Sequence, residues 1–582
     1  MKNRKLSAVI ASLLIAGMCL SQAACTNSDS ETEQTPGTSS NPETTTSSEA
    51  KKSEVTLTFR GYDTIAVPGV QDNDVMNELK NRLGISINYV IADPTKDKVT
   101  LASGDLPDIV QVKVNDLGTY IKGNHIIPLD ELVDQYGQDI KQNVPKMLEF
   151  SKQNLSAETG KLYGLTAGNY VNKGTTPVNS YAFGALVRWD YYKELGYPKI
   201  SNLDEYLNAI KTMQEKHPKT ADGKPVYGFS GWTDWGLWSY YVPYAFSHGW
   251  MNGDSDIYLF DASGNIQPTI SENGGIFKEA LQFMNKAYRL GLCDPEMFTQ
   301  KNADFLAKNK NLQLLTLPTN WWNGDAQKTM LAQGIKDGGF FLLPELTPVT
   351  WENYGSPIAG GLSDRCYTIS TNCKNPDRAM ELINFLFSFD GNKLFRNGIQ
   401  GKQWDMENGK PEYTNDTLKA MQSDPQFSQK NGIGAYYNNM CGLSGESMDN
   451  NGQYLSLSYT EKAMKFSITE ADKDFNKHYG VTYPGEAFIK AQEQGKTKIQ
   501  FFDNTWQNLM PDQPNDMKMI SGKIVNYQLA WAAQCIMSGS EADFEKNWKR
   551  GVSDMKNMGY DKLYSWIEQN NKIAVEKLKS IK

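Results

Sequence analysis

The sequence predicts a multidomain α/β protein with a helical C-terminal tail, and three observations lead to this expectation. The chain has 582 residues, which is too many for one hydrophobic core. Strand and helix patterns alternate as βαβαβ over residues 55–112, which is typical of a parallel sheet with covering helices. Residues 455–582 are helical by pattern, including Ile524 to Met537 and Phe544 to Met558.

The N-terminus has the pattern of a secretory signal peptide over residues 1–24. Lys2, Arg4 and Lys5 form its basic region, and an apolar run over 6–20 follows that is too short for a membrane span. Small residues then precede Cys25. We expect cleavage before Cys25 with lipidation of its thiol, although Gln22 stands where a lipidation signal has Leu. Ordinary cleavage that leaves a free Cys25 is the alternative.

Residues 25–52 are predicted to form a lipidated N-terminus and a disordered tether. The segment is rich in Ser, Thr, Glu, Asn and Pro and cannot bury enough apolar surface to fold. Removal of residues 1–24 removes three cations and no anions, which takes the net charge from −8 to −11. An acidic body argues against nucleic acid as a partner.

The first α/β unit is predicted from four segments. Strand patterns cover 55–60, 85–90 and 109–112, and a helix covers 74–83. Asp63 follows the first strand. Because ligands of open α/β sheets bind beyond the carboxyl ends of strands, Asp63 is a candidate polar contact, and a turn cap is the alternative.

A second unit is predicted downstream. Its apolar run at 181–187 ends in Arg188, a second candidate polar contact, with a surface salt bridge as the alternative. Helices are predicted at 203–216 and from Leu281 to Leu290, ended by Gly291 and followed by Asp294 as an N-cap with Pro295 at the first helical position. A buried strand is expected at 312–317, and 339–343 is expected to lead back to the first unit.

Tryptophans supply the candidate stacking surfaces for an apolar ring face. Trp321 and Trp322 follow the 312–317 segment and are the first choices. Trp232 and Trp235 lie in a loop containing Gly, Thr and Asp, where burial explains aromatics less easily. Trp238 and Tyr244 are assigned to core packing. Further candidates are Trp404 and, more weakly, Tyr354.

No metal or cofactor site is predicted. The cysteines form no CxxC pair, and Cys366 and Cys373 are expected to be free thiols, with a disulfide as the alternative. Residues 261–265, DASGN, are read as a hairpin turn rather than a calcium loop, because a hard cation needs about six or more oxygen ligands. The sequence contains no GxSxG, HExxH or P-loop motif.

Several phrases resemble one family: SGDLPDI at 103–109, GNHIIPLDELVDQYG at 123–137, GLCDPE at 291–296, the helix at 374–398 and GIQGKQW at 398–404. They are similar to extracellular solute-binding lipoproteins of ABC importers, in the large carbohydrate-binding branch (family 1-like). The resemblance implies a two-lobed, periplasmic-binding-protein-like α/β fold (type II) with a helical C-terminal extension. It places lobe 1 at 53–170 plus 338–397, and lobe 2 at 171–337 plus 398–582 with the helical tail.

The resemblance also implies a function. We expect a monomer, anchored by lipid at the extracytoplasmic face of the cell membrane, that captures an oligosaccharide between its lobes and delivers it to membrane permease subunits without catalysis. Two alternatives stay open: a binding protein for a peptide or other solute, and a secreted lipoprotein enzyme that degrades polysaccharide. A glycosidase needs only two suitably spaced carboxylates, which a sequence this rich in Asp and Glu can supply.

Overall fold

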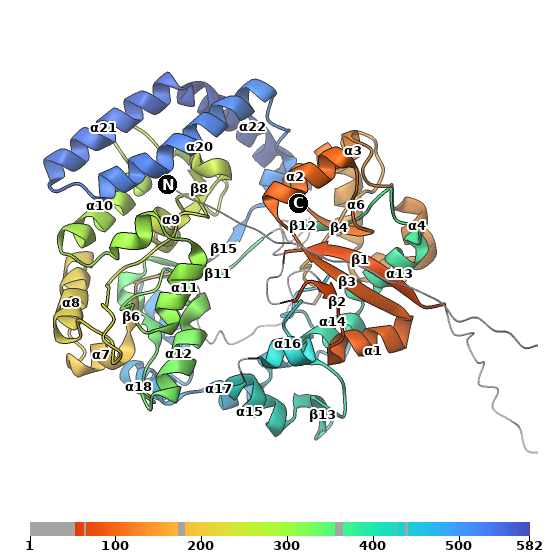
Figure 1. The fold of residues 1–582 in the computed structure, drawn as a ribbon, viewed down its shortest axis with the longest axis horizontal. Coiled ribbons are helices and arrows are strands. Elements are labelled where there is room, and N and C mark those ends of the chain that lie inside the picture. Colours follow the sequence, from red (N-terminus) through yellow and green to blue (C-terminus); the bar gives the residue numbers. More distant parts are fainter. Residues whose placement is uncertain are drawn as a thin grey trace, which may run out of the picture. The chain divides into compact units, whose positions relative to one another are not determined.

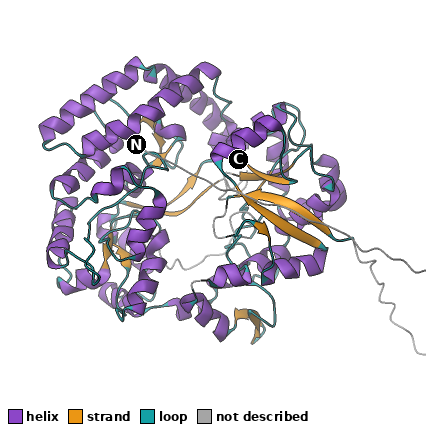
Figure 2. Cartoon of the chain, in the orientation of Figure 1, coloured by secondary structure: helices purple, strands orange, loops and turns teal. Residues whose placement is uncertain are grey.

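The computed structural model describes residues 53–62, 66–172, 181–355, 365–424, 426–436 and 440–581. Within these ranges helices predominate, with short strands between them (Figure 2). None of the helices in these ranges has the length and apolar character that crossing a membrane requires. Cys25, Asp63 and the predicted tether lie outside the described residues.

The first core is built on a mixed six-stranded sheet in the order β2-β3-β1-β4-β12-β5. The predicted βαβαβ unit forms its parallel centre, where β1 pairs with both β3 and β4. The helix between β1 and β3 begins after Asn73, whose side chain accepts from the Met76 amide, and ends at Gly84 with φ +65°. Only glycine adopts that left-handed conformation at little cost, so the sequence fixes this boundary.

Helices cover this sheet, and buried apolar residues of 57–167 and 367–455 form one cluster with it. We call this part lobe 1. Its strands are β1 (Val55–Gly61), β2 (Gly69–Val70), β3 (Ile85–Ile91), β4 (Ile109–Lys113), β5 (Leu165–Thr166) and β12 (Arg365–Ile369). Its helices are α1 (Asp74–Leu83), α2 (Pro94–Ser103), α3 (Leu117–Lys122), α4 (Asp130–Tyr136), α5 (Gln138–Asn143), α6 (Pro145–Asn154), α13 (Pro376–Phe387), α14 (Phe389–Asn397) and α16 (Phe427–Asn431).

The second core, lobe 2, gathers buried residues of 183–351 and 471–578. Its strands form small sheets: β6 (Leu186–Arg188) with β10 (Phe340–Leu342), β7 (Met251–Asn252) with β8 (Tyr258–Phe260) and β9 (Ile266–Pro268), and β11 (Val349–Gly355) with β15 (Lys498–Asp503). Its helices are α7 (Trp189–Glu194), α8 (Leu203–Lys216), α9 (Trp238–Ser247), α10 (Ile276–Arg289), α11 (Asn302–Lys310), α12 (Asn323–Ala332), α18 (Glu470–Tyr479) and α19 (Glu486–Glu493).

The structure moves two of the expected lobe boundaries. Residues 340–342 pair antiparallel with 186–188, so this strand belongs to lobe 2, and the chain does not return to lobe 1 at residue 338. It returns to lobe 1 between β11 and β12. Buried residues from Phe427 to Tyr436 and from Met440 to Leu455 pack into the core of lobe 1, although 398–582 was expected in lobe 2. A short apolar run does not specify which sheet it joins, because its partner strand is distant in the sequence.

A small cluster of its own connects the two parts. Tyr413, Leu418, Leu457 and Ala463 are buried together there. Tyr413 ends the hairpin of β13 (Trp404–Glu407) and β14 (Lys410–Tyr413), and Leu418 lies in α15 (Asn415–Ser423). Leu457 begins a 3₁₀ turn, Leu457–Tyr459, and Ala463 lies in α17 (Glu461–Ser467).

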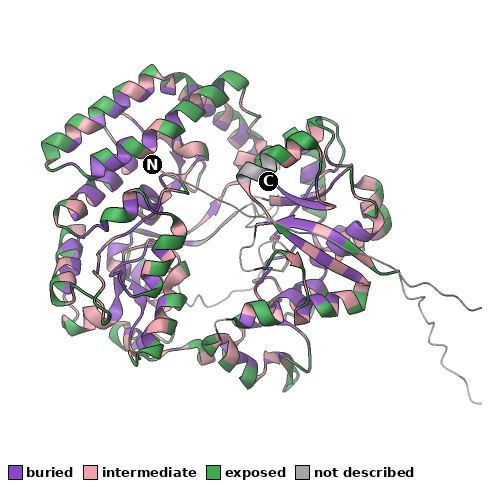
Figure 3. Ribbon diagram, in the orientation of Figure 1, coloured by how far each residue is buried: buried purple, intermediate pink, exposed green. Residues whose placement is uncertain are grey.

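The predicted helical tail is present as α20 (Asn515–Ile536), α21 (Glu541–Asn557) and α22 (Tyr560–Ile581) (Figure 1). Their buried sides face the protein and their outer sides are exposed (Figure 3). α20 packs on α10 and α21, where Trp531 and Trp548 are both buried with ring centroids 5.1 Å apart. The tail also reaches lobe 1, where Ile581 packs against a cluster that contains Leu117 and Tyr120.

Candidate functional site

Five tryptophans of lobe 2 lie together, and we call Trp232, Trp235, Trp238, Trp321 and Trp322 the tryptophan cluster. Trp238 is at its centre, stacked on Trp232 at 5.5 Å and on Trp321 at 5.9 Å between ring centroids. Trp235 meets Trp232 edge to face at 5.1 Å. The cluster therefore joins a loop before α9 with a segment about ninety residues later in the chain.

Two of these rings are presented to solvent. Trp321 is 52% exposed and Trp235 is 46% exposed, whereas Trp232 below them is fully buried. Exposed tryptophan rings are costly in water unless a partner covers them, and their faces suit the apolar C–H face of a sugar. Trp235 packs on buried Trp232 and Trp321 stacks on half-buried Trp238, so packing within lobe 2 restricts the positions of both exposed rings.

Local hydrogen bonds fix the segment that carries Trp321 and Trp322. The segment is a 3₁₀ turn, Asn320–Trp322, at the start of α12. The Thr319 hydroxyl and the Asn320 amide both donate to the Ala182 carbonyl at 3.0 Å. The Asn309 side-chain amide donates to the Trp322 carbonyl at 2.8 Å. Neighbouring parts of lobe 2 thus anchor both sides of the exposed turn.

The Asp294 carboxylate anchors the loop of Trp232. It accepts from the Ser230 hydroxyl at 2.7 Å and from the Gln300 amide at 3.1 Å, and Gln300 also donates to the Gly231 carbonyl at 2.6 Å. The predicted N-cap role is also present, since Asp294 accepts from the Glu296 amide. GLCDPE, one of the phrases that resembles the family, therefore supports the tryptophan loop from beneath.

The other predicted site residues fall elsewhere. Arg188 is 2% exposed, and its guanidinium donates to both oxygens of Asp190 and stacks over Tyr191, with its carbon 3.8 Å from the ring centroid. We therefore correct its assignment: it is a buried ion-pair residue, because Asp190 in the first turn of the following helix α7 supplies the counter-charge. Trp404 is half-buried against the small cluster of β14 and α15, and its indole donates to the Gly398 carbonyl. Tyr354 lies in β11, and Asp63 lies outside the described residues.

Trp238 was predicted to pack in the core, and it does pack against two buried clusters of lobe 2. It is also half-buried and stacks on exposed Trp321, so it belongs to the tryptophan cluster as well. Its spacing of three residues from Trp235 was the available signal. The 312–317 segment also differs from expectation: it is buried and bridges in parallel to Tyr227 through Leu314, but it does not form a strand.

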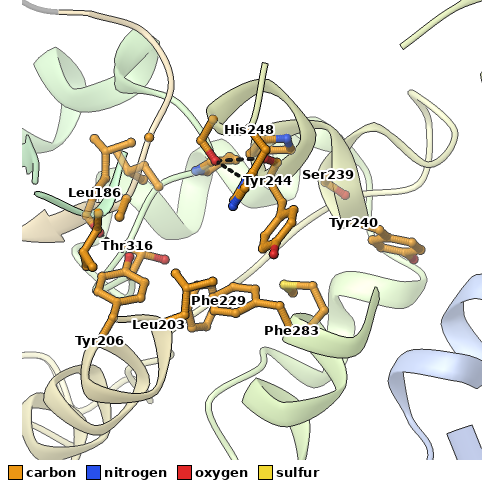
Figure 4. A pocket seen from close by; sticks show the side chains of 18 of the residues that line it. Leu186, Leu203, Tyr206, Phe229, Ser239, Tyr240, Tyr244, His248, Phe283 and Thr316 are labelled. Carbon is orange, nitrogen blue, oxygen red and sulfur yellow. Dashed lines mark hydrogen bonds between the residues drawn. The ribbon is translucent and has the colours of Figure 1, made fainter. Parts of the chain in front are cut away.

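A cavity of about 90 Å³ lies in lobe 2 (Figure 4). Phenol and hydroxyl side chains from Tyr206, Ser239, Tyr240 and Tyr244 line it together with the rings of Phe229 and Phe283. His248 lies at its edge, stacked on Tyr244 at 4.1 Å, and its Nδ1 donates to the Tyr244 carbonyl. Burial lowers the pKa of His248, and the hydrogen bond to Tyr244 offsets part of this effect.

The predicted turn and free thiols are present. In the DASGN turn, Asp261 accepts from the backbone amides of Ser263 and Asn265, both at 2.9 Å. Cys293, Cys366, Cys373, Cys441 and Cys535 are free thiols. Among the described residues, no three His, Cys, Asp or Glu side chains are grouped so that they could hold a metal ion.

Two separate hydrophobic cores, each with its own sheets and covering helices, define a two-lobed α/β protein. The model of the family described as bacterial extracellular solute-binding protein matches residues 76–393, more than half of the chain. The chain therefore belongs to this family, and the expected two-lobed fold is confirmed.

Known proteins agree with this fold. A fructooligosaccharide ABC transporter substrate-binding protein, FusA of Streptococcus pneumoniae, is 24% identical over 253 residues, which are 40% of this chain and 44% of FusA. The match thus spans less than half the length of this curated relative. The crystal structure of the alginate-binding protein AlgQ2 without calcium ion has a TM-score of 0.59 and 18% identity, covering 89% of this chain and 98% of that one.

Two further structures give similar values. FusA of S. pneumoniae in complex with kestose has a TM-score of 0.58 and 16% identity, covering 91% of this chain and all of that chain. A solute-binding protein of Bifidobacterium longum infantis that binds HMO has a TM-score of 0.58 and 13% identity, covering 90% and all of the two chains. At these identities the likeness shows the fold.

Proposed function

We propose that this protein is the substrate-binding component of an ABC transporter and captures an oligosaccharide between its two lobes. The exposed rings of Trp235, packed on buried Trp232, and of Trp321, stacked on half-buried Trp238, are the observation that carries the proposal. Two such faces can stack on successive sugar rings. FusA, a relative, is named for fructooligosaccharides, and the HMO-binding and alginate-binding neighbours share the fold.

Delivery follows from the two-lobed architecture. A ligand that contacts both lobes stabilises the closed form over the open form by its differential affinity. The permease subunits then recognise the closed, loaded form. This role requires no catalytic residue and no cofactor.

The same proposal covers the N-terminus. Residues 1–24 act as a signal peptide, Cys25 carries the lipid, and 25–52 tether the body, as a monomer, at the extracytoplasmic face of the membrane. Mass spectrometry of the protein purified from its native membrane tests this part. An N-terminal peptide that begins at acylated Cys25 supports the anchor, whereas an unmodified Cys25 contradicts it.

A thermal-shift screen of residues 53–582 against oligosaccharides tests the binding role. A ligand present at 100 times its Kd adds about 2.7 kcal/mol to the free energy of unfolding. We expect a selective rise in Tm that Trp321→Ala and Trp235→Ala each reduce. Met519→Ala, which also removes an exposed apolar side chain but on tail helix α20, should leave the rise unchanged.

The alternatives give different results in the same screen. Chromatography of the sugar after incubation shows it intact if the protein only binds it, and cleaved if the protein is an enzyme. A Tm that rises with peptides and with no sugar contradicts the oligosaccharide proposal and supports the other class of solute.

A further inference from the structure

A second cavity of about 270 Å³ lies away from the tryptophan rings. Its lining residues come from lobe 1, from the small cluster of β14 and α15, and from helix α12 of lobe 2; they are Lys328, Arg396, Tyr413, Met421, Asp424, Phe427, Ser428, Ile433, Gly434, Ser456 and Ser458. Lys328 is the contribution of lobe 2. An engineered protein cavity of about 150 Å³ holds a benzene ring, so this cavity has room for a six-membered sugar ring.

The charges on its wall are not balanced. Neither Lys328 nor Arg396 forms an ion pair with any residue in the described ranges, and Arg396 donates instead to the Leu443 carbonyl at 2.7 Å. Asp424 is the carboxylate of the wall, and it is already paired with Lys430 at 2.9 Å. Two cationic residues thus line one cavity without an ion pair in the part of the chain that the structure describes, and the one carboxylate of the wall is paired elsewhere, in a chain whose net charge is −8. An unneutralised pair of cations attracts an anion.

The rest of the wall suits a sugar ring. Ser428, Ser456 and Ser458 bring hydroxyl groups, and Met421, Phe427 and Ile433 bring apolar surface. A uronic acid or a sulfated sugar presents the complementary set: a charged group, hydroxyls and an apolar ring face. An inorganic anion alone would leave the apolar part of the wall uncovered.

The cavity is also connected to the tryptophan cluster through the chain. Lys328 is six residues beyond Trp322, and helix α12 joins them directly. At 1.5 Å per residue this is a rise of about 9 Å. We propose that the cavity binds the charged group of an acidic sugar unit, in an oligosaccharide whose other rings stack on the tryptophan cluster. This inference rests on the proposed function and names its substrate class.

Matched pairs of sugars test the inference. Tri- and tetrasaccharides of galacturonate, glucuronate and mannuronate are each titrated by calorimetry beside the carboxyl-reduced neutral counterpart. The protein variants are wild type, Lys328→Gln and Lys336→Gln. Lys328 makes no hydrogen bond or ion pair within the described part of the chain, so its loss should not disturb folding. Lys336 is another exposed lysine of lobe 2, and it lines neither cavity.

We expect wild type to bind at least one acidic sugar about tenfold tighter than its neutral counterpart, the effect of one charge-assisted hydrogen bond. The preference should weaken as salt is added, disappear in Lys328→Gln and persist in Lys336→Gln. Equal binding of acidic and neutral sugars, or a preference that survives Lys328→Gln, overturns the inference. If neutral sugars bind equally well and Trp321→Ala abolishes that binding, the proposed function holds and only the acidic-sugar inference fails. If neither acidic nor neutral sugars bind, the inference and the proposed function both fail.

Discussion

The Asp294 carboxylate and the Lys308 ammonium group lie 2.7 Å apart, with Asp294 fully buried. Lys308 comes from α11, and its Nζ is also 5.7 Å from the centre of the Tyr227 ring. The same carboxylate accepts hydrogen bonds from Ser230 and Gln300. This ion pair therefore joins α11, the 291–296 turn and the loop of the buried tryptophan.

Replacement of Asp294 tests the structural role of this pair. In Asp294→Ala, Lys308 loses its buried carboxylate partner, and Ser230 and Gln300 lose a hydrogen-bond acceptor. We therefore expect the free energy of unfolding to fall by about 3–5 kcal/mol. Urea denaturation measures it. Glu296→Ala is the control, because Glu296 pairs with the same lysine but is exposed. Equal, small losses in both variants would show that the buried pair does not hold the loop.

Replacement of a buried tryptophan should mainly lower stability, whereas replacement of an exposed one should mainly weaken sugar binding. Trp232 is fully buried against Phe305, at 4.7 Å between ring centroids, so Trp232→Ala should cost about 3–5 kcal/mol. Trp321→Ala removes an exposed ring and should cost far less stability while it weakens sugar binding. Denaturation and calorimetry on both variants give the two quantities. A large loss of stability in Trp321→Ala would mean that this ring belongs to the core.

Two glycines of the tail helices should respond in opposite directions to alanine. A Cβ at Gly551 in α21 would lie 1.9 Å from the Trp531 Nε1, so Gly551→Ala should destabilise by about 1–3 kcal/mol. A Cβ at Gly522 in α20 meets nothing within 4 Å, and Gly522→Ala should stabilise by about 0.5–1 kcal/mol. Thermal melts of both variants measure the difference. A Gly551→Ala variant as stable as wild type would contradict the close packing of α20 on α21.

His248 should make stability depend on pH. Burial lowers the pKa of His248 in the folded protein below its ordinary value of about 6.5. As pH falls, the unfolded chain therefore takes up this proton before the folded protein does. This histidine therefore contributes a loss of stability as pH falls from about 7 towards 5. His248→Gln should show a weaker dependence in urea denaturation over that range, with the difference between the two proteins constant above pH 8. Parallel pH profiles would contradict the lowered pKa.

Local patterns determined the elements that depend only on neighbouring residues. Helices α1 and α8 have the predicted bounds because apolar spacing and their caps at Asn73 and Asn202 lie within a few residues. The first core's βαβαβ unit followed from the same signals. The GLCDPE turn was also predicted, since Asp294 caps the residues next to it.

Tertiary structure decided what depends on distant partners. The sequence pointed to Trp232, Trp235, Trp321 and Trp322, but only packing shows that Trp232 is the buried support and Trp321 the exposed face. Arg188 was predicted to contact the ligand because it ends a strand, yet its charge is neutralised by Asp190 inside the protein. Residues 340–342 joined the other lobe because β6 is their partner. Periodicity reports which residues are apolar, whereas burial and pairing depend on contacts between segments far apart in the chain.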